Sequence, residues 1–146
     1  MNGDPIPDEE RIARYCQPSQ IDQGQLTPGV FMLRKVRNEA YLSVFLLDRF
    51  AGATDPEKLD ALRGAAHPRL LTFSKSAVLA LLQVGRSKEH IGKATNGARA
   101  IRVLHAPIVE PLPFENHGGI YDTAVDEWEM ANYLLEAVEA AHPALI

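Results

Sequence analysis

The apolar run at residues 77–84, AVLALLQV, limits the possible folds of this chain more than any other segment. Its side chains are apolar except for Gln83, so the segment belongs in a core. Periodicity alone does not separate a buried strand from a buried helix. The length of the run and the Gly85 that closes it favour a central strand, and we therefore expect a sheet that contains it.

Three other segments have the composition or the alternation of strands. Residues 30–34 and 41–46 are rich in β-branched and aromatic side chains, and Asn38 and Glu39 lie between them as a turn. This arrangement predicts an antiparallel hairpin. Residues 99–105 alternate well enough to predict a further strand.

The first element of the chain, at residues 9–16, fits either a short helix or a strand. Pro18 follows closely and disfavours helix ahead of it, which favours a strand over the second half of the segment. Such a strand would bury Ile12 and Cys16 on one face. Residues 17–29 are rich in turn-forming residues and predict a long polar loop.

A helix is expected to start at residues 54–57, TDPE. Either Thr54 caps it and Glu57 closes a capping box, or Asp55 caps it with Pro56 at the first helical position. The apolar residues that follow have helical spacing: Leu59, Leu62 and Ala66.

The last segment has the clearest helical pattern and is predicted to form one long amphipathic helix from Thr123 to Ala141. Thr123 is placed to cap it. Its predicted apolar face, which packs through Trp128, comprises Ala124, Trp128, Ala131, Leu135 and Val138.

These elements predict an α+β fold: a mostly antiparallel sheet of about four or five strands with helices on one face. A chain of 146 residues is a usual size for one core. We expect residues 1–8 to form a flexible arm, because they lack periodicity, and residues 9–146 to form a single globular domain.

Composition excludes several classes of protein. The net charge of -4 argues against generic nucleic-acid binding. A single cysteine, Cys16, fits the cytosol and rules out an internal disulfide. The start of the chain does not resemble a signal peptide, and the longest apolar run, residues 77–82, is far shorter than the roughly 20 residues of a membrane span. We therefore expect a cytoplasmic protein without membrane contact.

The stretch ENHGGIYD, residues 115–122, is the most chemically suggestive. His117 precedes two glycines, and a His-Gly-Gly-Gly stretch supplies oxyanion-hole amides in one class of esterase. Here Ile120 replaces the third glycine, so the esterase interpretation fails. Gly118 and Gly119 are interpreted as a hinge that turns the proline-rich segment 107–114 toward the last helix.

No metal site or cofactor is expected. The only neighbouring trio of ligand-type residues, His105, Glu110 and His117, matches no zinc spacing.

The leading functional hypothesis is a small non-catalytic module that binds a protein partner, such as the small subunit of a bacterial multi-protein system. It follows from the missing catalytic, metal and phosphate-binding motifs, and a homo-oligomer is left open. Recognition concentrates on loops. The predicted contact residues are Gln20, Asp22, Gln25, Val109, Leu112 and Phe114.

The alternative is a small hydrolase or nucleotide-dependent group transferase. His117 would act as acid–base, and Arg14, Ser43 and His105 would line the pocket. This alternative requires His117 to lie within about 10 Å of at least two of those residues, close enough to share one small ligand.

Overall fold

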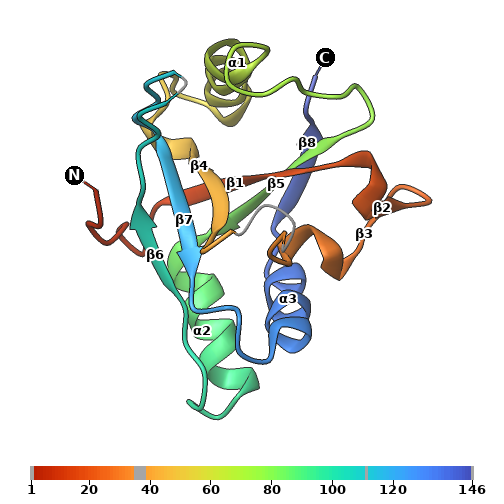
Figure 1. The fold of residues 1–146 in the computed structure, drawn as a ribbon, viewed down its shortest axis with the longest axis vertical. Coiled ribbons are helices and arrows are strands. Elements are labelled where there is room, and N and C mark those ends of the chain that lie inside the picture. The colour runs from red at the N-terminus through yellow and green to blue at the C-terminus, as the bar shows by residue number, and fades with distance from the viewer. Residues whose placement is uncertain (1, 35–38, 111, 146) are drawn as a thin grey trace.

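The computed structural model describes residues 2–34, 39–110 and 112–145. The protein is an α+β domain whose six-stranded antiparallel sheet has the strand order β6-β7-β4-β1-β5-β8 (Figure 1). A short hairpin of β2 and β3 lies outside it. The strands are β1 Arg11–Cys16, β2 Ile21–Asp22, β3 Gln25–Leu26, β4 Leu42–Leu46, β5 Val78–Gln83, β6 Arg102–His105, β7 His117–Tyr121 and β8 Ala140–Pro143, and the helices are α1 Asp55–Ala66, α2 Val84–Ala94 and α3 Glu127–Glu136.

The apolar run is a strand inside the sheet, as predicted: β5 pairs with β1 on one side and β8 on the other. Leu79 and Leu81 belong to one core cluster, and Ala80 and Leu82 to a second. Side chains alternate between the faces of a sheet, so both faces of β5 are covered. This double burial explains why the run is continuously apolar.

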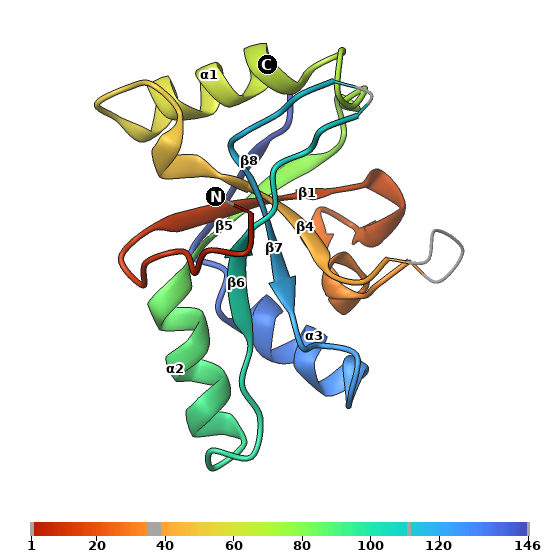
Figure 2. The same ribbon diagram turned by 60° about the vertical axis from the view of Figure 1, so that its left-hand side comes forward.

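Helices cover both faces of the sheet, whereas the sequence predicted one covered face. Helices α2 and α3 contribute Ile91 and Leu134 to the core cluster on one face. On the other face, α1 contributes Leu59 and Leu62. Figure 2 shows α1 on one side of the sheet and α2 and α3 on the other.

The C-terminal helix is shorter than predicted. Helix α3 has 10 residues and begins at Glu127, after Asp126 has adopted a left-handed backbone with a φ of 55°. The end of the predicted helix is instead strand β8, which forms the sheet edge beside β5. Helical periodicity cannot reveal this because a tertiary pairing overrides the local preference.

The buried face of α3 also differs from the predicted one. Met130, Ala131 and Leu134 are buried, whereas the side chain of Trp128 is 57% exposed. The prediction that the helix packs through Trp128 is therefore wrong. The buried residues have the spacing i, i+1 and i+4, which is also typical of one helix face. This face is rotated around the helix axis relative to the predicted one.

The predicted hairpin of residues 30–34 and 41–46 is also wrong. Val30 and Phe31 lie in a short 3₁₀ helix, Pro28–Phe31, and pack into the core shared with α3. The second half of the hairpin does form β4, but its neighbours are β7 and β1. Asn38, part of the predicted turn, lies outside the described residues.

Several other local predictions are confirmed. The Thr54 hydroxyl accepts a hydrogen bond from the Glu57 amide and caps α1. Strand β1 buries Ile12 and Cys16 in the same core cluster. The strand predicted at residues 99–105 is β6.

The first residues of the chain are docked on the sheet. The Gly3 amide donates to the His105 carbonyl, and the Ile6 amide donates to the Val103 carbonyl. Ile6 is buried in the core. The buried isoleucine anchors its segment along β6, while the mobility predicted for residues 1–8 stays a prediction. None of the helices in the described ranges is long and apolar enough to cross a bilayer.

Candidate functional site

His117 lies on a strand and not in a glycine turn, which corrects the hinge interpretation of Gly118 and Gly119. In the register of β7 with β4, His117 faces Phe45 and Gly119 faces Ser43. Partners in an antiparallel pair share a face of the sheet, and so do alternate residues of one strand. His117, Phe45 and Ser43 therefore project from the same face.

The two glycines are needed because neighbouring groups approach the strand closely. A Cβ on Gly118 would lie 2.8 Å from Leu46 Cδ2 and 2.9 Å from the Leu104 carbonyl oxygen. A Cβ on Gly119 would lie 2.8 Å from Cγ of Tyr41, whose ring lies across the strand.

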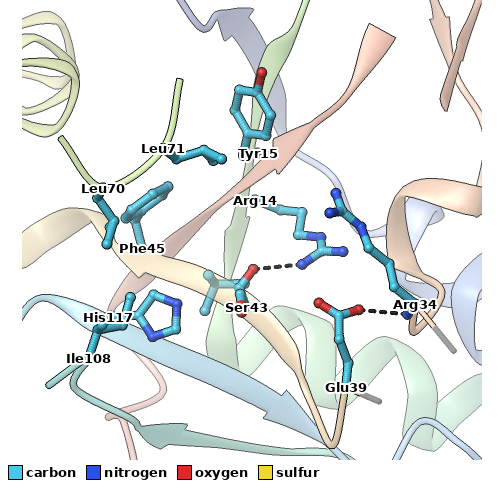
Figure 3. Close-up of a pocket in the computed structure, with 11 residues that line it drawn as sticks. Arg14, Tyr15, Arg34, Glu39, Ser43, Phe45, Leu70, Leu71, Ile108 and His117 are labelled. Atoms are coloured by element: carbon cyan, nitrogen blue, oxygen red, sulfur yellow. Dashed lines mark hydrogen bonds between the residues drawn. The ribbon is translucent and has the colours of Figure 1, made fainter. Parts of the chain in front are cut away.

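Arg14 occupies an opening between two strands of the sheet. Strands β1 and β4 pair only through Ile12 with Leu46 and Ala13 with Phe45. Beyond these pairs, backbone hydrogen bonds between β1 and β4 stop, and the Arg14 side chain bonds to the backbone of β4 instead. Its Nη1 donates to the Ser43 carbonyl at 2.8 Å, as Figure 3 shows, and its Nε donates to the Val30 carbonyl at 2.8 Å.

The charge of Arg14 is buried without a directly paired carboxylate, although the charge of Glu39 acts on it at longer range. The side chain is only 4% exposed, and no carboxylate of the described residues forms an ion pair with it. Burial lowers the pKa of this guanidinium below its usual value. A buried charge without a direct ionic partner is costly, so an anion beside Arg14 would be stabilised.

His117 is buried and its tautomer is determined by one hydrogen bond. Its Nδ1 lies 2.7 Å from the Ala106 carbonyl oxygen, which can only accept, so Nδ1 carries the proton. Burial is the main cause that lowers the pKa of His117, and the nearby charge of Arg14 acts in the same direction. The ring is therefore neutral near pH 7, with a lone pair on Nε2.

These side chains line one pocket with a volume of about 260 Å³ (Figure 3). Its polar part includes the backbone-bonded Arg14, the serine of β4 and the histidine of β7. Its apolar part includes Leu71, which is 38% exposed. The lining residues are Arg14, Tyr15, Arg34, Glu39, Ser43, Val44, Phe45, Leu70, Leu71, Ile108 and His117.

In this lining, Arg14, Ser43 and His117 each have a polar side-chain atom with no hydrogen-bond partner among the described residues: Nη2, Oγ and Nε2. Within the same part of the chain, no fully buried polar side-chain atom lacks a partner. The three atoms must therefore border accessible space, and the pocket is the space that their residues line. Each is available to a ligand.

Of the four residues predicted to form a catalytic set, three share this pocket and His105 does not. His105 pairs with Gly118 in the register of β6 and β7, one residue out of phase with His117. A shift of one residue places a side chain on the opposite face of the sheet. His105 Nε2 instead lies 2.8 Å from the Glu115 carbonyl oxygen.

No group of three or more His, Cys, Asp and Glu side chains in the described part of the chain could hold a metal ion. The considered trio of His105, Glu110 and His117 is not such a group.

The predicted partner-binding residues lie in different environments. Asp22 and Gln25 are exposed on the β2–β3 hairpin, and Val109 is 74% exposed. The Gln20 side chain donates to the Gly29 carbonyl at 3.0 Å. The others are less available: Leu112 is half-buried, and Phe114 is buried in the core beside Phe45 and Phe50.

Sequence reasoning missed most of the pocket wall. Arg34 and Glu39 flank residues 35–38, and the Arg34 amide donates to Glu39 Oε1 at 2.6 Å. Leu70, Leu71 and Ile108 come from the segments that follow α1 and β6. No local pattern links these segments with β1 and β4, because they meet only through the tertiary fold.

Comparisons with known proteins add no relative. Protein-family models, curated proteins and solved structures all fail to match this chain.

Proposed function

We propose that this domain binds a small organic anion with an apolar body, in the pocket between β1 and β4. The observation that carries the proposal is Arg14: it is buried, no described carboxylate pairs with it, and its Nη2 is open to the pocket. An anion in the pocket offsets the cost of burying that charge. Phe45, Leu70 and Ile108 provide an apolar wall for the rest of the ligand.

The size of the pocket supports a small ligand. Its volume is about 260 Å³, whereas sites for drug-sized molecules have roughly 300–1,000 Å³. A small acid suits this volume better than a whole nucleotide does. The size therefore counts against the nucleotide-dependent transferase considered from the sequence.

The test is calorimetric titration of the protein with phenylacetate and phenyl phosphate as probe anions. We expect the wild type to bind at least one of them and Arg14→Met to bind it about 10- to 150-fold more weakly, since a hydrogen bond to a charged group contributes about 1.5–3 kcal/mol. Arg86→Met is the matched control, because Arg86 is exposed and pairs with Glu139 at the surface.

Circular dichroism would verify that Arg14→Met is folded, and Arg14→Lys, which keeps the positive charge, gives a second measurement. Failure of both probes to bind the wild type would refute the proposal, as would an unchanged affinity in Arg14→Met.

A small hydrolase is a second candidate, because the open Nε2 of His117 shares the pocket with the Ser43 hydroxyl and Arg14. His105 is no longer part of this candidate set. Hydrolysis of p-nitrophenyl acetate by the wild type and its loss in His117→Asn would support catalysis. Binding of the probe anions without turnover would leave the domain a binding protein.

A protein-binding accessory role is the third candidate. The exposed Val109 and the exposed side chains of Asp22 and Gln25 support it. Light scattering after size exclusion, with and without cell extract, would measure the mass of the particle. A chain that stays monomeric under both conditions would contradict this role.

A further inference from the structure

The pocket has one net positive charge among its described lining residues. Arg14 and Arg34 contribute two positive charges, and Glu39 contributes one negative charge. His117 adds none, because burial lowers its pKa and keeps the ring neutral. A single negative charge on the ligand balances these described charges, whereas a dianionic phosphate monoester exceeds them by one negative charge in a partly desolvated pocket.

The geometry of Arg14 agrees with a compact anion. Its Nε and Nη1 are engaged by the carbonyls of Val30 and Ser43, and these bonds hold the guanidinium in place. Nη2 is the part that remains open to the pocket. A carboxylate oxygen can accept a hydrogen bond from Nη2, and charge-assisted hydrogen bonds of this kind are the stronger ones in proteins.

His117 selects for a hydrogen-bond donor on the ligand. Because Nδ1 donates to the Ala106 carbonyl, Nε2 of the neutral ring can only accept. The ligand atom that meets Nε2 must therefore carry a hydrogen. A hydroxyl suits this position better than an ammonium group, since the charge of Arg14 already acts on His117 and would repel a second cation.

Apolar side chains line the same pocket as these two polar groups. Phe45 pairs with His117 across the strands, and Leu70 and Ile108 line the pocket as well. Their surfaces favour a hydrocarbon or aromatic skeleton, because apolar contact contributes by removing surface from water.

We propose that the ligand is a hydroxyl-bearing apolar monocarboxylic acid. Its carboxylate binds Arg14, its carbon skeleton lies against Phe45, and its hydroxyl donates to Nε2 of His117. This inference rests on the proposed function and specifies its ligand class. It makes His117 a residue that determines ligand specificity, whether or not the protein also catalyses a reaction.

The experiment compares the affinities of five probes at pH 8 by calorimetry: phenylacetate, its three isomeric ring-hydroxylated forms, and phenyl phosphate. At least one hydroxylated isomer should bind about 2- to 12-fold more tightly than phenylacetate, the gain of one neutral hydrogen bond. Phenyl phosphate should bind more weakly than phenylacetate, because its second charge has no partner among the described lining residues.

His117→Asn isolates the role of the ring. Asparagine can still donate to the Ala106 carbonyl but has no acceptor at the position of Nε2. In this variant the ratio between the affinity for the hydroxylated isomer and the affinity for phenylacetate should fall to about 1, whatever the change in the affinity for phenylacetate itself. The matched control is His90→Asn, since His90 lies at the surface beside Glu136 and is not part of the pocket.

The possible failures are distinguishable. If phenyl phosphate bound more tightly than phenylacetate, the assignment of a monocarboxylate ligand would be wrong, whereas the proposed anion-binding function would still hold. The absence of any gain from all three hydroxyl positions, or a gain that persists in His117→Asn, would overturn the role of His117. Failure of every probe to bind would overturn the proposed function as well.

Discussion

Replacing Gly119 by alanine tests the close packing of Tyr41 against strand β7. Gly119 pairs with Ser43 in the sheet, and the ring of Tyr41 lies over it. An added Cβ would lie 2.8 Å from Cγ and 2.9 Å from Cε1 of that ring. Since these atoms are not the end of a flexible chain, the whole ring must move.

The expected cost follows from what Tyr41 loses when it moves. Its ring stacks on Tyr121 with centroids 4.8 Å apart, a contact that contributes about 0.5–1.5 kcal/mol. Forcing extra carbon into a packed site costs about 1–3 kcal/mol in general. We expect Gly119→Ala to lower the free energy of unfolding by about 1–3 kcal/mol.

Gly64→Ala is the matched control. Gly64 lies inside α1, and a Cβ there meets no heavy atom within 4 Å. Alanine is the better helix former, so this variant should gain about 0.5–1 kcal/mol. Urea unfolding followed by circular dichroism measures both changes, and the same substitution should have opposite signs at the two positions.

A double-mutant cycle with Tyr41→Ala decides whether the ring is the cause. Once Tyr41 is truncated, Gly119→Ala should cost much less than it does in the wild type, because the clashing atoms are gone. The close-approach argument is refuted if Gly119→Ala is neutral, or if its cost is unchanged in the Tyr41→Ala background.

Three further predictions concern stability. Thr54→Ala removes the cap of α1 and should cost about 1 kcal/mol in a urea melt, with Thr54→Ser restoring most of it. Burial raises the pKa of Asp48, but hydrogen bonds from Arg11 and Lys58 outweigh this effect and lower the pKa to about 2. This lowered pKa stabilises the fold above about pH 4 and the effect is lost toward pH 2, so Asp48→Asn should flatten acid unfolding over that range. The buried His117 has a lowered pKa, so the unfolded state takes up its proton first, and stability should fall as the pH drops below about 6.5. His117→Asn should remove that part of the pH dependence, and an identical profile in the variant would contradict it.

Part of the site could be found from the sequence. The sequence predicts Arg14, Ser43 and His117 as members of one candidate set, and the structure places all three around one pocket. His105 belongs to the same predicted set, but strand register places it and His117 on opposite faces of the sheet. The roles of Leu70 and Ile108 in the pocket have no local signature, because contacts between distant segments determine them.

Local patterns in the sequence were sufficient to predict α1 with its Thr54 cap, the strand in the apolar run at residues 77–84, and the α+β class. These features depend on periodicity, capping and composition, which act over a few neighbouring residues. Only the tertiary structure decided that helices cover both faces, that residues 140–143 form an edge strand, and that β1 separates from β4 around Arg14. These features arise from pairing and burial between segments far apart in the chain, so the pocket exists only once the sheet has formed.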